Sequence, residues 1–199
     1  MDVVANKRQH PSQIQQNIFQ IALELFRTAG YEATTIQDIC EKADVSVGAF
    51  YYYYKSKEDI LNDSYRECDH LLDEKYGHVV FDDPITGILE ILSSMSQSIQ
   101  EQGFRVPAQF YKNQIIANER FILRQDRSHY RLIYRLVEQA LACGQLNTDD
   151  SPQTIVDTIM RVARGVLYDW CLHDGAYDPA YQIRADIQIV LRYFQRKDI

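Results

Sequence analysis

The stretch ALELFRTAGYEATTIQDICEKADVSVGAFYYYYKSKEDIL, residues 22–61, decides the fold of the N-terminal part of the chain. Apolar residues from Ile14 to Phe26 recur at three- and four-residue spacing and form one stripe on a helix. Gly30 follows the last of them and can adopt the left-handed backbone that ends a helix. We therefore expect a first helix over about residues 12–29.

Two short helices should follow. Thr35, with Asp38 three residues later, is a variant of the capping box and predicts a helix from about residue 36. Asp44 falls in the break after that helix, and Ser46 is an N-cap for another brief helix over 47–53. Two short helices about three residues apart, after a longer one, are the pattern of a helix-turn-helix, whose second short helix enters the major groove of DNA.

The second short helix is unusually rich in tyrosine, with Tyr51–Tyr54 in an unbroken run. A helix distributes four consecutive residues around its circumference, so at least two phenol groups must face outward. Beside Lys55 and Lys57, exposed phenols suit a phosphate backbone, whose oxygens accept hydrogen bonds. Packing against neighbouring helices is the alternative, and we expect it for Phe50 and Tyr54. We expect DNA contact for Tyr51, Tyr52 and Tyr53.

At these residues the chain resembles the N-terminal signature of tetracycline-repressor (TetR) family regulators. The resemblance covers residues 14–61, about a quarter of the chain, without a gap. It includes a helix ending in Ala-Gly-Tyr, the Thr-Thr cap, Val-Ser at the turn, Gly48, Tyr51 and the Ser-Lys-Glu start of the next helix. It implies an N-terminal helix-turn-helix domain over 1–56 and an all-helical effector-binding and dimerisation domain over 57–199.

The resemblance also implies a role for each matching residue. The start of the second helix, at Thr35, would hold a phosphate, and Lys57 would clamp another. The implied DNA contacts are Thr35, Ser46, Val47, Gly48, Ala49, Tyr51, Tyr52, Tyr53, Lys55 and Lys57. Val47 stands where the family often has a basic or polar residue, and Ala49 where it often has threonine, so base recognition here would use apolar contact with thymine methyl groups. Asp44 replaces the commoner glycine of the turn and adds a negative charge.

Beyond residue 61 the capping residues, prolines and glycines predict more helices and no strand. Asp83-Pro84, Ser151-Pro152 and Asp178-Pro179 each place a capping side chain before a proline, which is typical of a helix start. Glycines follow three of the apolar patterns as C-terminal caps: Gly103, Gly144 and Gly175. One or two helices fit between residues 107 and 143, with a break near 118–127. The prediction is an all-α chain of about nine helices.

Charge is distributed unevenly along the chain. The net charge is −7, which by itself disfavours nucleic acid, because DNA binding relies on Lys and Arg at phosphates. Residues 1–57 are balanced, with six basic and six acidic side chains, and residues 58–199 carry the whole excess. DNA is therefore expected to bind the first part. With no long apolar stretch and no signal-peptide pattern, a soluble cytoplasmic protein without membrane contact is expected.

The last two expected helices, which start at Pro152 and Pro179, have wide apolar faces. A four-helix interface between two copies would cover them and place two recognition helices on successive turns of a near-palindromic operator. The alternative is that these residues form the core of a monomer. The predicted homodimer interface comprises Ile155, Ile159, Val162, Val166, Ile183, Ile187, Val190, Leu191 and Phe194. A pocket for a small-molecule effector is expected among Met95, Phe104, Phe110, Tyr111, Phe121, Tyr134 and Trp170, although each of these is also compatible with plain core.

A row of arginines lies at roughly four-residue spacing: Arg120, Arg124, Arg127, Arg131 and Arg135. On one continuous helix they would align and could hold an anionic ligand, or they could form a solvated face paired with carboxylates. The four cysteines have no C-x-x-C spacing and signal neither a disulfide framework nor a zinc site. Cys171 and His173 point away from each other on a helix, so they do not form a nucleophile–base pair.

The sequence thus predicts a DNA-binding transcriptional regulator that is not an enzyme and needs no cofactor or metal. The favoured form is a repressor released from its operator by a small-molecule effector. A DNA-binding adaptor of the same fold, controlled by a protein partner, and a ligand-dependent activator remain alternatives.

Overall fold

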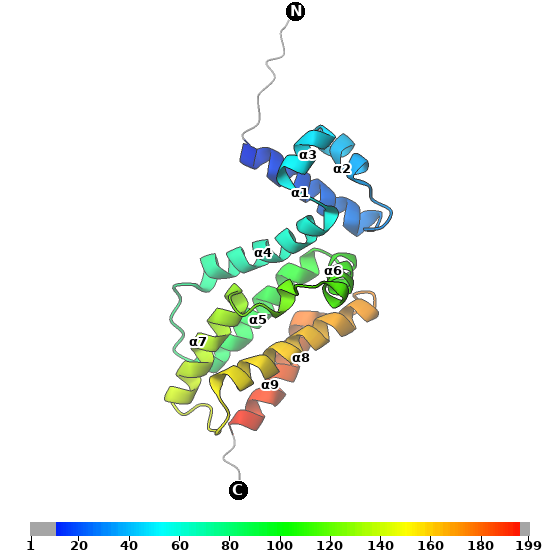
Figure 1. Cartoon of the computed structure of the whole chain (residues 1–199). Coiled ribbons are helices and arrows are strands. Elements are labelled where there is room, and N and C mark those ends of the chain that lie inside the picture. The colour runs from blue at the N-terminus through cyan, green and yellow to red at the C-terminus, as the bar shows by residue number, and fades with distance from the viewer. Residues whose placement is uncertain (1–10, 196–199) are drawn as a thin grey trace, which may run out of the picture. The chain divides into compact units, whose positions relative to one another are not determined.

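The computed structural model describes residues 11–195, which form nine α-helices, one 3-10 turn and no strand (Figure 1). This confirms the all-α prediction. The chain divides into two compact units, and the division follows Leu61, inside helix α4 (Lys57–Tyr76). That is about one helical turn beyond the boundary expected after residue 56, because Ile60 and Leu61 are buried and belong to the smaller unit.

The smaller unit comprises α1 (Pro11–Thr28), α2 (Ile36–Ala43), α3 (Val47–Tyr53) and the first turn of α4. Its helices meet over a small apolar core, which consists of Ile18, Ala22, Phe26, Ile39, Cys40, Ala43, Phe50, Tyr54, Ile60 and Leu61. Each fully buried Ile or Phe side chain stabilises the fold by roughly 1.5 to 3 kcal/mol relative to an exposed one. Asn17 adds a polar link, because its Nδ2 donates to the carbonyl of Ala43 at 3.0 Å.

The capping box predicted at the start of α2 is present. Thr35 Oγ1 accepts from the backbone N–H of Asp38 at 3.1 Å, and Asp38 Oδ2 accepts from the backbone N–H of Thr35 at 2.7 Å. These bonds satisfy two N–H groups that a helix start leaves without partners. The bond from the Thr35 N–H also holds the pKa of the Asp38 carboxyl below its usual value, since it favours the ionised form.

The turn between α2 and α3 depends on one left-handed residue. Asp44 has φ 53° and ψ 48°, so the backbone reverses within the span predicted as the break. The Val45 N–H donates back to the Cys40 carbonyl at 3.0 Å, and Ser46 Oγ then accepts from the Ala49 N–H at 3.1 Å to start α3. One left-handed residue and one serine cap therefore set the break between the two short helices.

The larger unit contains the rest of α4 and five further helices. They are α5 (Pro84–Glu101), α6 (Arg105–Ile116), α7 (Ser128–Ala142), α8 (Pro152–Leu172) and α9 (Pro179–Phe194). Helix α5 packs against both α7 and α9, and α8 contacts α6, α7 and α9 (Figure 1). The three predicted proline starts are confirmed, because Asp83, Ser151 and Asp178 each cap the helix that follows.

The predicted break before α7 is also present. Helix α6 ends at Ile116, and the chain to Ser128 contains only the 3-10 turn Phe121–Leu123. Gln114 holds this turn, because its Oε1 accepts from the backbone N–H of Ile122 at 3.0 Å. The segment thereby returns Ile122 to the interior of the unit, where it lines a cavity described below.

Replacing Asp44 tests the demand for a left-handed residue in the turn. Asp44→Gly should stabilise the smaller unit by about 0.5 kcal/mol, because glycine adopts this backbone without a Cβ penalty, whereas Asp44→Ala should destabilise it by about 1 kcal/mol. Urea unfolding followed by circular dichroism measures both. Equal stability of the glycine and alanine variants would contradict the assignment.

Candidate nucleic-acid interface and buried cavity

The first turn of α3 lies open on the surface. Ser46 and Gly48 are exposed, the Val47 side chain is 46% exposed, and Ala49 is half-buried. A Cβ built on Gly48 would meet only Ser46 Oγ, at 3.8 Å, so no other part of the described chain lies within 4 Å of this position. The structure brings the residues predicted to face base edges into one uncovered turn.

The tyrosine run divides as expected between core and surface. Phe50 and Tyr54 are buried, whereas the side chains of Tyr51 and Tyr52 are 54% and 80% exposed. Tyr53 is half-buried, and its ring meets that of Tyr52 edge-on with centroids 4.9 Å apart. Exposed phenol rings are amphipathic and able to donate, so this surface can engage an acceptor-rich partner.

Lys57 has a structural role that sequence reasoning missed. Its Nζ donates to the carbonyls of Tyr31 and Thr34, each at 2.6 Å, and lies 4.3 Å from the centroid of the Tyr31 ring. Burial lowers the pKa of Lys57 below its ordinary value. Two of the three ammonium hydrogens thus fix the α1–α2 connection, and one remains for an external acceptor. Lys55, by contrast, is exposed.

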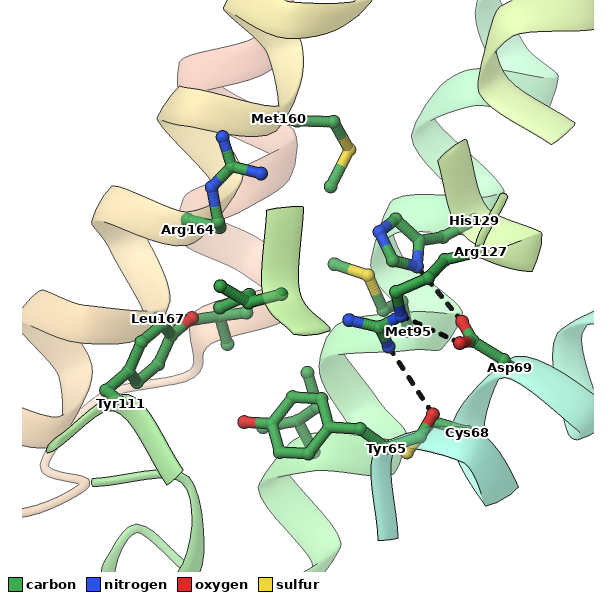
Figure 2. Close-up of a pocket in the computed structure, with 12 residues that line it drawn as sticks. Tyr65, Cys68, Asp69, Met95, Tyr111, Arg127, His129, Met160, Arg164 and Leu167 are labelled. Carbon is green, nitrogen blue, oxygen red and sulfur yellow. Dashed lines mark hydrogen bonds and ion pairs between the residues drawn. The ribbon is translucent and has the colours of Figure 1, made fainter. Parts of the chain in front are cut away.

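The larger unit contains a buried cavity (Figure 2). The volume at its centre is about 20 Å³, room for little more than one water molecule. Of the seven predicted pocket residues, Met95 and Tyr111 line it. The other lining residues were not predicted: Tyr65, Cys68, Asp69, Ile99, Ile122, Arg127, His129, Met160, Arg164 and Leu167.

The remaining five predicted pocket residues lie elsewhere. Phe110 is core and stacks on Tyr65 with centroids 3.6 Å apart, and the Phe121 ring lies 4.5 Å from the Arg127 guanidinium, outside the lining. Phe104 and Trp170 pack at Gly175, and Tyr134 is half-buried on α7 away from the cavity. An aromatic residue at a core-facing helical position does not reveal which internal space it borders, so composition alone does not select the residues that line this cavity.

One wall of the cavity is a buried charged cluster around Asp69. Arg127 Nε donates to Asp69 Oδ2 at 2.8 Å, and His129 Nδ1 lies 3.1 Å from Asp69 Oδ1 (Figure 2). Burial lowers the pKa of His129, despite the neighbouring carboxylate, so the ring is neutral at pH 7 and Nδ1 must carry the donated proton. Burial alone would raise the pKa of Asp69, but bonds from His129 and Arg127 hold it below its usual value.

The arginine row is not one continuous face. Arg120 and Arg124 lie in the connection before α7, so the alignment expected on an unbroken helix is wrong for them. The other three arginines bind α4 and the residue that follows it. Arg127 binds Asp69, Arg131 binds Asp73 at 2.9 Å, and Arg135 donates to the carbonyls of Tyr76 and Gly77 at 3.2 and 3.1 Å. The contacted residues advance by about four positions along α4 as the arginines do along α7, so the two helices run in the same direction.

The residues predicted for the dimer interface mostly face the chain's own core. Seven of the nine are buried inside the chain's own larger unit, where a second copy has no access to them: Ile155, Ile159, Val166, Ile183, Ile187, Leu191 and Phe194. Val162 and Val190 are half-buried. The periodic stripes mark the faces of α8 and α9 that pack inward. The opposite faces instead expose other apolar side chains, which are Tyr168, Leu172, Tyr181, Ile189 and Tyr193.

The described residues contain neither a membrane-spanning helix nor a metal-binding cluster. Between residues 11 and 195, no helix is both long and apolar enough to cross a membrane. In the same part of the chain, no three His, Cys, Asp or Glu side chains gather closely enough to hold a metal ion.

The smaller unit defines a helix-turn-helix DNA-binding protein, since two short capped helices follow a longer one and the second exposes its first turn. Residues 18–63 match the family model described as bacterial regulatory proteins, tetR family. Residues 18–63 are therefore a TetR-family DNA-binding domain, and the chain is a transcriptional regulator of that type.

Similarity to known regulators extends through both units. The HTH-type transcriptional regulator AcrR of Shigella flexneri is 22% identical over 94% of this chain and 92% of its own length. The HTH-type transcriptional repressor KstR2 of Rhodococcus jostii is 28% identical over 66% of this chain and 67% of its own. The crystal structure of FadR from Thermus thermophilus, a TetR-family repressor in complex with lauroyl-CoA, has a TM-score of 0.68, 21% identity and coverage of 93% and 97%.

His129 gives stability a defined pH dependence. Its pKa is lowered in the folded chain, so below pH 6.5, the ordinary value, the unfolded chain takes up a proton that the folded chain does not. Stability should therefore be complete above that pH and fall as the pH drops from 7 to 5, by up to about 1.4 kcal/mol per unit from this residue. Urea unfolding of wild type and His129→Gln at pH 7.5, 6.5 and 5.5 checks it. The variant's curve should be flatter, and parallel curves would contradict the assignment.

Proposed function

We propose that this regulator is a repressor that binds a near-palindromic operator as a homodimer and leaves it when a small molecule occupies the cavity of Figure 2. The uncovered first turn of α3, with two exposed tyrosines beside it, is the observation that carries the DNA contact. A related repressor supports repression over activation, and a structurally similar repressor in complex with lauroyl-CoA supports control by an effector. We assign the chain no enzymatic activity and no cofactor, and place it in the cytoplasm with the chromosome.

In this proposal α3 lies in the major groove. Ser46 and Gly48 bring the backbone close to base edges, while the Val47 and Ala49 methyl groups contact thymine methyls. The phosphate contacts are Thr35 at the start of α2, Tyr51, Tyr52 and Tyr53 through their hydroxyls, Lys55, and the third hydrogen of the Lys57 ammonium. The exposed carboxylate of Asp44 lies in the same turn and opposes phosphate.

The outward faces of α8 and α9 are proposed as the dimer contact. On α9 a stripe at four-residue spacing presents Tyr181, Ala185, Ile189 and Tyr193. On α8, Gly165 is exposed with no atom within 4 Å of a built Cβ, so another backbone can approach there. Exposed apolar side chains gathered on one helix face are typical of a protein–protein contact.

Helix α4 couples the two activities. It runs unbroken from Lys57 to Tyr76 and so belongs to both units, and its Tyr65, Cys68 and Asp69 line the cavity. A ligand that moves the Asp69–Arg127 contact shifts α4, and the shift is transmitted along the helix to the DNA-binding unit. Ligand and operator then oppose each other through a coupling that is typically about 1 to 3 kcal/mol.

Gly48→Ala tests the approach of DNA to α3. The added methyl meets only Ser46 Oγ at 3.8 Å, and alanine favours a helix by about 1 kcal/mol, so the smaller unit should be at least as stable as in wild type. Affinity for DNA upstream of the regulator's own gene should nevertheless fall about tenfold or more, because the methyl occupies space that the bases need. Fluorescence anisotropy at fixed salt, with a thermal melt as the control, measures both. Unchanged affinity would rule out this docking.

Ile189→Glu tests the dimer face. Ile189 is 66% exposed, so a glutamate there costs the monomer little, yet it would place charge in the proposed contact. Light scattering should show a dimer for wild type and a monomer for the variant. Ile116→Glu on α6, at an isoleucine that is 78% exposed, is the matched control and should remain dimeric. A dimeric Ile189→Glu variant would place the interface elsewhere.

A further inference from the structure

Arg164, on α8, is a half-buried cation of the cavity wall that makes no ion pair with a carboxylate of the described residues. None of the ion pairs or hydrogen bonds found among residues 11–195 involves its guanidinium. Asp157, two turns earlier on the same helix, makes no ion pair with Arg164 and acts on it only at longer range, and its carboxylate accepts from Tyr130 Oη at 2.9 Å. Burial lowers the pKa of Arg164 from its ordinary value, which is the cost of holding a charge away from water.

Two phenol groups face the same space. The Tyr65 side chain is buried and fixed by its stack on Phe110, yet its hydroxyl has no hydrogen-bond partner. Tyr111 also lines the cavity, and no hydrogen bond of its hydroxyl is found among the described residues. Burial raises the pKa of both phenols, so both remain protonated donors. Figure 2 shows Arg164 and the two tyrosines around the space, with Asp69 on the far side.

The charge count of the cavity wall is one positive charge in excess. Arg127 is neutralised by its ion pair with Asp69 and also donates to the Tyr65 carbonyl, and His129 is neutral at pH 7. No second carboxylate lines the cavity to pair with Arg164, and Asp157 acts on it only from outside the lining. A half-buried cation is stabilised by a partner that brings both an opposite charge and hydrogen-bond acceptors, so the group that fits this wall is a monoanion.

The rest of the lining is apolar and deformable. It comprises Met95, Ile99, Ile122, Met160 and Leu167. Methionine side chains adapt to irregular shapes, so this wall can open around an apolar body even though the space now holds about 20 Å³. The opening has to displace side chains next to Asp69, which is where occupancy would act on α4.

We propose that the effector is a monoanionic amphipathic carboxylate, whose head binds Arg164 with the Tyr65 and Tyr111 hydroxyls and whose apolar body lies between the two methionines. This inference rests on the proposed effector control of the same cavity. The carboxylate supplies hydrogen-bond acceptors for both phenols and a negative charge that pairs with Arg164. Asp69 repels a second negative charge and so disfavours dianions.

Calorimetry of the full-length chain with matched probes tests the head-group. The probes are octanoate and 4-phenylbutyrate, their neutral amides, and octylamine. Both carboxylates should bind about tenfold or more tightly than their amides, as charge-assisted hydrogen bonds imply, and octylamine should not bind. Amides that bind as tightly as the acids, or acids that do not bind at all, would overturn the proposal.

Variants locate the binding. Arg164→Gln should remove the advantage of acid over amide, Arg164→Lys should keep part of it, and Tyr65→Phe should reduce carboxylate affinity several-fold. Arg161→Gln is the matched control, because Arg161 is exposed on the same helix and its guanidinium donates to Thr158. Thermal melts establish that each variant is folded. If Arg161→Gln lowers the affinity as much as Arg164→Gln does, binding is superficial and the proposal is wrong.

Fluorescence anisotropy with the upstream DNA distinguishes a failure of this inference from a failure of the proposed operator function. Octanoate should release wild type from DNA and fail to release Arg164→Gln, although that variant binds DNA normally without ligand. If the chain binds DNA but the acids bind no better than the amides, the head-group assignment fails and the regulator remains. If no DNA is bound although the acids bind at Arg164, the proposed operator function fails and the cavity chemistry stands.

Discussion

The buried contact of Asp69 with Arg127 and His129 is the interaction on which the larger unit depends. It places a carboxylate inside the protein, which is tolerated only because two donors meet it at 2.8 and 3.1 Å. Removing one partner of such a buried pair typically costs about 3 to 5 kcal/mol, since the other charge is left uncompensated. The contact therefore fixes the register of α4 on α7, and Arg131 and Arg135 repeat that register one and two turns later.

This register also decides what faces the cavity. Once Asp69 is bound to Arg127, Tyr65 lies one turn earlier on the same helix face and its ring is held by Phe110. Arg127 is neutralised by the contact, so Arg164 is the cation of the cavity lining that has no ion-pair partner among the described residues. Structural stability and ligand chemistry thus share one carboxylate, and a molecule that binds beside it disturbs the contact that holds α4.

Much of the fold could be predicted from the sequence because its signals are local. Thr35, Ser46 and Asp83 cap helices through bonds that span two or three residues, and Asp44 needs only its own backbone angle. The surface of α3 was also predictable, since four tyrosines in a row on a helix cannot all face inward. These features depend on spacing along the chain and not on packing between distant segments.

The lining of the cavity and the exposed face of α8 and α9 could not be predicted from local spacing along the chain. Apolar periodicity marks the buried side of a helix, but it does not say whether the chain's own core or a second copy covers that side, and for Ile183 and Leu191 the cover is the chain itself. For the same reason, five of the seven residues predicted for the pocket lie outside the lining of this cavity. A usable signal was present in the acids: Asp69 and Asp73 have the same four-residue spacing as Arg127 and Arg131, and matching the two rows would have paired the helices.

Trp170 gives the molecule a built-in optical reporter. It is the single tryptophan of the chain, it is 2% exposed, and its indole lies in the larger unit near Phe104 and Gly175. Emission excited at the red edge of its absorption therefore comes from that unit alone, whereas circular dichroism averages over both. Comparing the two signals during unfolding reveals whether the DNA-binding helices melt separately, without any dye or added label.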